Sequence, residues 1–138
     1  MGQLIEFIQS VKGDPFEWGK HDCFTFASRC SLLQGGPDFA GEWLGSYSTA
    51  AGAIRAYKKA QAQFPQHGNL FGFLDSVLIP IQTLHPPIGS IVAKDNPEGR
   101  PFSASLGVVV GGSAGAFVGT DGLEAIPLQY TDKFWSIQ

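Results

Sequence analysis

Apolar residues recur at helical spacing in the first half of the chain and in short β-type runs in the second half. Over residues 3–12 they repeat every three or four positions until a glycine and a proline follow, which predicts a short amphipathic helix. A second helix is predicted from Cys23 to the glycines at positions 35 and 36. Its inward face is formed by Cys23, Phe26, Ala27, Cys30 and Leu33.

Two more helices are predicted before residue 80. Ser48 is a suitable N-cap for a helix over residues 49–63. The inward residues of this helix are Ala50, Ala53, Ile54 and Tyr57, and its solvated residues are Arg55, Lys58 and Lys59. A short apolar helix is predicted over residues 69–78, where a strand is the alternative interpretation of the same run.

From Pro86 onward the pattern changes to short runs that are typical of strands and are separated by glycine-rich turns. These runs are Ile88–Ala93, Leu106–Val110, Ala116–Val118, Leu123–Pro127 and Phe134–Ile137. Residues 95–101 are the expected mobile loop. Helices followed by strands predict a single α+β domain over residues 1–138, in which N-terminal helices pack on an antiparallel β-meander.

Composition narrows the classes of partner. Of the 138 residues 43% are hydrophobic and 15% are charged, the net charge is -3, and Lys and Arg form no cluster. We therefore expect no nucleic-acid binding and no membrane insertion. The first eleven residues are too short and amphipathic for a signal peptide, so synthesis in a host cytoplasm is expected. A sparsely charged surface favours protein partners, and we expect them to contact Trp43, Tyr47, Phe71 and Phe73.

Cys23 is the candidate for chemistry. Asp22 is a good N-cap residue, which places Cys23 in the first helical turn, where unpaired N–H groups and the helix dipole favour an anion. Such a position is expected to lower the pKa of a thiol and to make it a nucleophile. The alternative is that Cys23 is simply a packed core residue. Cys30 lies too far along the same helix to form a disulfide with it, so both thiols should be free.

A cysteine nucleophile requires a base, which is recognised by its position in space. The chain has three histidines, His21, His67 and His85, each in a predicted loop and each expected to be exposed. His21 is the weak candidate base because it precedes Cys23 by only two residues. The spacing of His21, Cys23 and Cys30 does not fit a zinc site. We expect neither a metal nor another cofactor.

Trp18-Gly19 followed by Asp22-Cys23 at the start of a helix resembles the nucleophile motif of the NlpC-type, papain-like cysteine peptidases, which cut cell-wall peptides. Residues 89–92 and 105–109 resemble the first two sheet strands of that family. A closer resemblance is to small tailed-phage and prophage proteins of this superfamily that are encoded among tail genes. It covers nearly the whole chain and is carried by residues 16–27, 36–47, 106–109 and 119–128.

The resemblance implies a papain-like fold with an incomplete site. In active members a histidine opens the second strand, where this chain has Ser105, or Ala104 if the alignment shifts by one residue. The family's aspartate in the first strand is Ser90 here. We therefore expect a structural or assembly protein of the virion tail that binds other tail proteins and carries a degenerate peptidase site. The alternative is an active cysteine peptidase or amidase on cell-wall peptide, with Cys23 as nucleophile and His21 or His85 as base.

Overall fold

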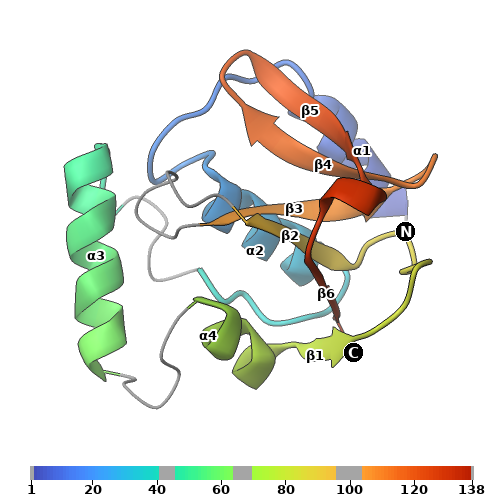
Figure 1. Ribbon diagram of the computed structural model, residues 1–138. Coiled ribbons are helices and arrows are strands. Elements are labelled where there is room, and N and C mark those ends of the chain that lie inside the picture. Colours follow the sequence, from blue (N-terminus) through green and yellow to red (C-terminus); the bar gives the residue numbers. More distant parts are fainter. Residues whose placement is uncertain (1, 41–45, 64–69, 96–103, 138) are drawn as a thin grey trace.

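Helices occupy the first half of the chain and strands the second, as the hydrophobic pattern predicts (Figure 1). The computed structural model describes residues 2–40, 46–63, 70–95 and 104–137. Within these ranges the helices are α1 (Gly2–Ser10), α2 (Cys23–Leu33), α3 (Ala50–Gln63) and α4 (Leu70–Val77). The apolar run before residue 80 is thus a helix, which decides between the two interpretations of that segment.

The strands form one antiparallel sheet in the order β1-β6-β2-β3-β4-β5. Their bounds are β1 (Ile79–Ile81), β2 (Ile91–Asp95), β3 (Ala104–Val110), β4 (Ala114–Gly119), β5 (Gly122–Pro127) and β6 (Lys133–Ser136), with the 3-10 turn η2 (Leu128–Tyr130) before β6. Strands β2 to β5 form the predicted meander. After η2 the chain returns across the sheet and inserts β6 between β1 and β2.

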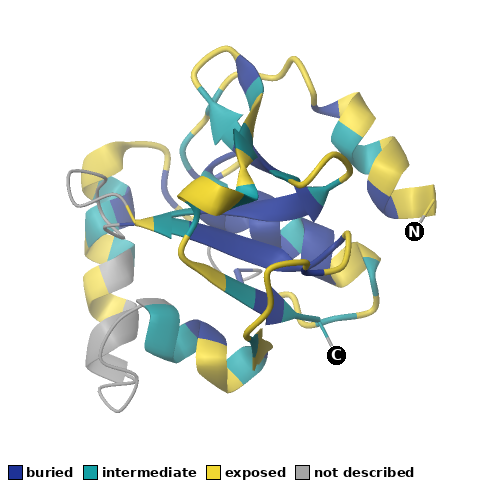
Figure 2. Ribbon diagram, turned by 45° about the vertical axis from the view of Figure 1, so that its right-hand side comes forward, coloured by how far each residue is buried: buried dark blue, intermediate teal, exposed yellow. Residues whose placement is uncertain are grey.

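Helix α2 packs on one face of the sheet, mainly against β3 (Figures 1 and 2). Side chains alternate along a strand, so β3 directs Ala104, Leu106 and Val108 toward α2. Val109, from the alternate positions, packs on the other face of the sheet with Val92 and Phe117. The core therefore extends over both faces of the central strands, which are buried in Figure 2.

Four local predictions differ from the structure. Helix α2 is buried on most of its sides and not on one face alone, because α1, the sheet and the segment after the helix enclose it. Leu33, predicted to face inward, is exposed at the end of this helix. Ala50, in the first turn of α3, is also exposed. The short strand β1 was not predicted, because Pro80 interrupts a run whose pairing depends on the distant β6. Tyr47 is buried, so it is not part of an exposed aromatic surface.

Phe71 and Phe73 are only half-buried, but both pack against the core cluster that contains Phe24 and Trp135. The expectations for Trp43, for His67 and for most of the loop at residues 95–101 fall outside the described residues. None of the helices in the described part of the chain is long and apolar enough to cross a membrane.

Candidate functional site

The start of α2 is built around the carboxylate of Asp22, which is fully buried and caps the helix. Its Oδ1 accepts hydrogen bonds from the Thr25 backbone N–H at 2.9 Å and from the Thr25 hydroxyl at 3.0 Å. The Thr25 hydroxyl in turn accepts the Asp22 N–H at 3.0 Å, which completes a capping box. The predicted N-cap is therefore confirmed, with Cys23 as the first residue of the helix.

The other carboxylate oxygen joins two more segments to the helix start. Oδ2 of Asp22 accepts the Gly19 backbone N–H at 2.9 Å and the Tyr47 hydroxyl at 2.6 Å. Gly19 has φ of +81°, and a Cβ at this position would lie 1.8 Å from the Tyr47 carbonyl oxygen. A buried carboxylate must be fully hydrogen-bonded, so the Trp18-Gly19 and Asp22 part of the motif serves to hold the loop, the helix and Tyr47 together.

Cys23 is the first residue of α2, as the sequence predicts, but the pKa of its thiol is raised rather than lowered. The residue is partly exposed and packs against the core cluster that contains Ala104 and Leu106 of β3. Burial raises the pKa of the Cys23 thiol to about 12, the Asp22 charge adds to this, and the N–H groups of Leu106, Cys23 and Phe24 only partly offset it. The expectation that the helix start lowers this pKa is therefore wrong, and the group is a neutral thiol at pH 7.

The start of β3 contacts Cys23 as the motif order predicts, but through a different residue. Ala104 and Leu106 share the core cluster of Cys23. Ser105 lies between them and pairs with Lys94 of β2, so strand alternation directs its side chain to the opposite face. Ala104 and Leu106, and not Ser105, are therefore the β3 residues on the face that packs against Cys23.

His21 is not the exposed loop residue that the sequence predicts. Only 6% of its surface is accessible, and neither ring nitrogen has a hydrogen-bond partner among the described residues. Its ring packs edge-on against Phe26, with centroids 5.9 Å apart. Phe26 belongs to a core cluster with Leu4 and Val108, separate from that of Cys23. Burial lowers the pKa of His21 from its usual 6.5, a shift that the nearby Asp14 opposes.

His85 is exposed, as predicted, but it lies far from Cys23. It lines a cavity beside Gly112 and Ser113, which follow the end of β3, whereas Cys23 contacts the beginning of that strand. Seven residues of extended chain separate the two ends by roughly 20 Å. Neither His21 nor His85 is therefore placed to exchange a proton with the Cys23 thiol.

A family model described as a domain of unknown function (DUF6950) matches residues 2–137. The chain belongs to this family. A search of curated proteins and a search of solved structures found no match. The DUF6950 match covers the loop before α2, the helix and all six strands, so the Cys23 region and the sheet belong to one family domain.

Two features of this DUF6950 domain depend on contacts between distant segments, which local sequence patterns do not indicate. Tyr47 binds Asp22 from 25 positions away, and no local pattern indicates that contact. The sequence left Ser105 and Ala104 open as the residue on the Cys23 side of β3, and strand pairing decides for Ala104. Within the described part of the chain, no group of three or more His, Cys, Asp or Glu side chains could hold a metal ion.

Proposed function

We propose that the protein is a structural or assembly component of a phage or prophage tail, built on a papain-like, NlpC-type fold with a degenerate peptidase site. The observation that carries the non-catalytic part is the state of Cys23, whose pKa is raised to about 12 by burial. The β3 residues on the face that packs against Cys23 are Ala104 and Leu106, neither of which can act as a base. The tail assignment rests on the resemblance of residues 16–27 and of the later segments to tail-gene-encoded proteins.

The chemistry of peptide cleavage supports this interpretation. A cysteine peptidase needs a thiolate to attack the carbonyl and an imidazole to protonate the departing amine. General acid–base transfer of this kind contributes on the order of 100- to 10,000-fold to the rate. The chain has no histidine after His85, so β2 to β6 contain none.

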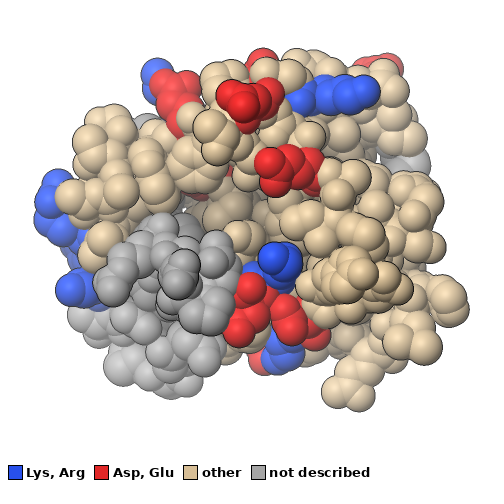
Figure 3. All heavy atoms as spheres, turned by 45° about the horizontal axis from the view of Figure 1, so that its top comes forward, with Lys and Arg blue, Asp and Glu red and all other residues tan. Residues whose placement is uncertain are grey.

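The surface supports an assembly role. In Figure 3 charged side chains lie along the top, at the left edge and in the lower centre of the face, and much of its right-hand side below the top shows none. Several large apolar side chains are exposed, among them Leu32, Ile79, Leu84, Ile88 and Tyr130. Exposed apolar groups of this kind are favourable in protein–protein interfaces.

An active cysteine peptidase or amidase remains the second candidate, because one feature of the site favours it. The N–H groups of Leu106 and Phe24 act on the Cys23 sulfur, and backbone donors beside a nucleophile are what an oxyanion requires. This candidate needs a base that neither His21 nor His85 supplies from its position in the fold.

The test compares wild-type protein with Cys23→Ala in two assays. In the phage or prophage that encodes it, loss of the protein should abolish tail assembly, and both wild type and Cys23→Ala should restore it. Neither purified protein should hydrolyse a muropeptide mixture, because the thiol is neutral and lacks a positioned base. Assembly that proceeds normally without the protein would contradict the tail role.

Two neighbouring substitutions, one on each face of β3, form a matched pair of test and control. Ala104→His places an imidazole on the face of β3 that contacts Cys23, whereas Ser105→His places it on the other face. Alkylation of Cys23 at pH 7.5 should therefore accelerate in Ala104→His and stay at the wild-type rate in Ser105→His. Cleavage of muropeptides by wild type but not by Cys23→Ala would show that the protein is a peptidase.

A further inference from the structure

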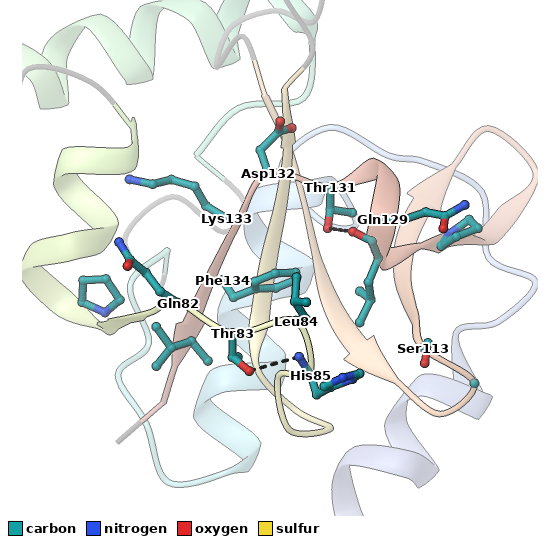
Figure 4. Close-up of a pocket in the computed structure, with 15 residues that line it drawn as sticks. Gln82, Thr83, Leu84, His85, Ser113, Gln129, Thr131, Asp132, Lys133 and Phe134 are labelled. Carbon is teal, nitrogen blue, oxygen red and sulfur yellow. Dashed lines mark hydrogen bonds between the residues drawn. The ribbon is translucent and has the colours of Figure 1, made fainter.

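A cavity of about 810 Å³ lies where the chain segments after β1 and after β3 meet η2 and the start of β6 (Figure 4). One wall is the connection from β1 to β2, and the other combines the turn between β3 and β4 with η2. Phe134 of β6 and Leu128 contribute the apolar surface between the walls. This volume lies within the range of roughly 300–1,000 Å³ that is usual for small-molecule sites.

The charged residues at this cavity are already engaged. Oδ2 of Asp132 accepts the backbone N–H of Asp95 at 2.6 Å. The ammonium group of Lys133 lies 5.4 Å from the centre of the Phe71 ring, on the side of α4. Their opposite charges leave no net charge at the site, so a strongly charged ligand gains little here.

The remaining polar side chains of the lining are amides, hydroxyls and the imidazole of His85, and Gln82 and Gln129 lie on opposite sides of the cavity (Figure 4). The side chains of Gln82, Ser113 and Gln129 have no hydrogen-bond partner among the described residues, and they come from both walls. An amide or a hydroxyl group can both donate and accept hydrogen bonds. The hydroxyl of Thr83 accepts the backbone N–H of His85 at 3.1 Å, which shapes the wall that carries Gln82.

We propose that this cavity binds a neutral oligosaccharide. Sugar hydroxyls donate and accept in the same way as the amides of Gln82 and Gln129, and they carry no charge that must be paired. The C–H faces of a sugar ring are apolar and complement the ring of Phe134 and the side chain of Leu128. The site thus combines an apolar contact with a small number of polar groups that set the orientation of the ligand.

The strands beside the cavity favour a sugar over an extended peptide. Peptides that bind along a sheet gain affinity from main-chain hydrogen bonds to an open edge. Strand β6 already has β1 and β2 on its two sides, and the middle residue of β1 is Pro80, which has no N–H. A peptide in this cavity would therefore lack the main-chain partners that such binding requires.

The experiment titrates three neutral trisaccharides, chitotriose, cellotriose and maltotriose, into the full-length protein and follows its backbone amide signals by NMR. At least one trisaccharide should shift the signals of residues 82–85, 113 and 128–134, and leave those of residues 22–25 unchanged. Gln82→Ala and Gln129→Ala should each weaken binding about fivefold, the effect of one lost hydrogen bond of ordinary strength. Gln9→Ala, on the exposed face of α1, is the matched control and should bind like wild type.

The proposal is overturned if none of the three sugars shifts these signals at about 20 mM, well above the dissociation constant of a millimolar site. It is also overturned if Gln82→Ala and Gln129→Ala bind as tightly as Gln9→Ala. A proline-rich peptide without charge is the competing probe, and binding of this peptide in place of the sugars would assign the cavity to a protein partner. None of these outcomes affects the tail role, because the cavity does not include Cys23.

Discussion

At the scale of single residues, the burial of His21 links the stability of the protein to pH. Its imidazole is neutral and enclosed, and its nitrogens have no partner among the described residues. The acidic groups Asp14, Asp22 and Glu17 favour the charged form, Arg29 opposes it, and burial outweighs them. The pKa of His21 is therefore below 6.5 in the folded protein and close to 6.5 in the unfolded chain.

A lowered pKa means that the unfolded state takes up the proton first as the pH falls. The stabilising effect of neutral His21 is complete above pH 6.5 and is lost as the pH falls through the folded-state pKa. In this interval the free energy of unfolding should fall by up to about 1.4 kcal/mol per pH unit. His21→Leu should remove this slope, which urea unfolding measured between pH 7 and pH 5 would detect.

The exposed His85 provides the control for this measurement. His85→Leu should keep the wild-type dependence on pH, because it leaves the buried imidazole of His21 in place. If the free energy of unfolding changes equally with pH in wild type and in His21→Leu, the buried imidazole is not the cause of the loss of stability at low pH.

At the scale of elements, the loop before α2 depends on one glycine. Gly19 has a positive φ and donates its N–H to Asp22, and its α-carbon lies against the Tyr47 carbonyl. A side chain here is strained twice, first by the left-handed backbone and then by a clash with a main-chain oxygen. The motif before Cys23 thus acts as a structural element even without catalysis.

Gly19→Ala should lower the free energy of unfolding by more than about 2 kcal/mol, since a left-handed alanine alone costs roughly 1–2 kcal/mol. Gly13→Ala is the matched control, because a Cβ at Gly13 meets no atom within 4 Å. Thermal or urea denaturation compares the two variants. Equal stability of Gly19→Ala and Gly13→Ala would show that the contact with Tyr47 is not a constraint on the loop.

At the scale of the whole molecule, both edges of the sheet carry a proline. Pro80 is the middle residue of edge strand β1, and Pro127 is the last residue of edge strand β5. The N–H of Leu123 on β5 is also occupied, because it donates to the Lys12 carbonyl at 2.8 Å. Edge prolines interrupt the row of free N–H groups through which sheets of two molecules would otherwise pair.

Pro80→Val should therefore promote self-association, because it supplies the missing N–H together with a β-branched side chain suited to a strand. Sedimentation velocity at increasing protein concentration should show a larger dimer fraction for Pro80→Val than for wild type. Pro15→Val, in the exposed loop before α2, is the control and should sediment like wild type. Identical profiles for the Pro80 and Pro15 variants would show that β1 does not control association.

Local interactions explain what could be predicted from the sequence. The start of α2 depends on Asp22 and Thr25, which are three residues apart, and its end depends on the neighbouring glycines. Apolar periodicity and glycine turns lie within a few residues, so they predicted the helices and the meander. The α+β class and the position of Cys23 at the helix start followed from these short-range patterns.

Contacts between distant segments decided the rest. Strand pairing determines that Ala104 rather than Ser105 faces Cys23, and the enclosure of α2 raises a thiol pKa that the helix start alone would lower. Tyr47 reaches Asp22 across 25 positions, and the cavity with Gln82 and Gln129 exists only where separate connections meet. Sequence patterns determine which element a segment forms. Burial, pKa values and the direction in which a side chain points depend instead on packing between elements, which only the tertiary structure contains.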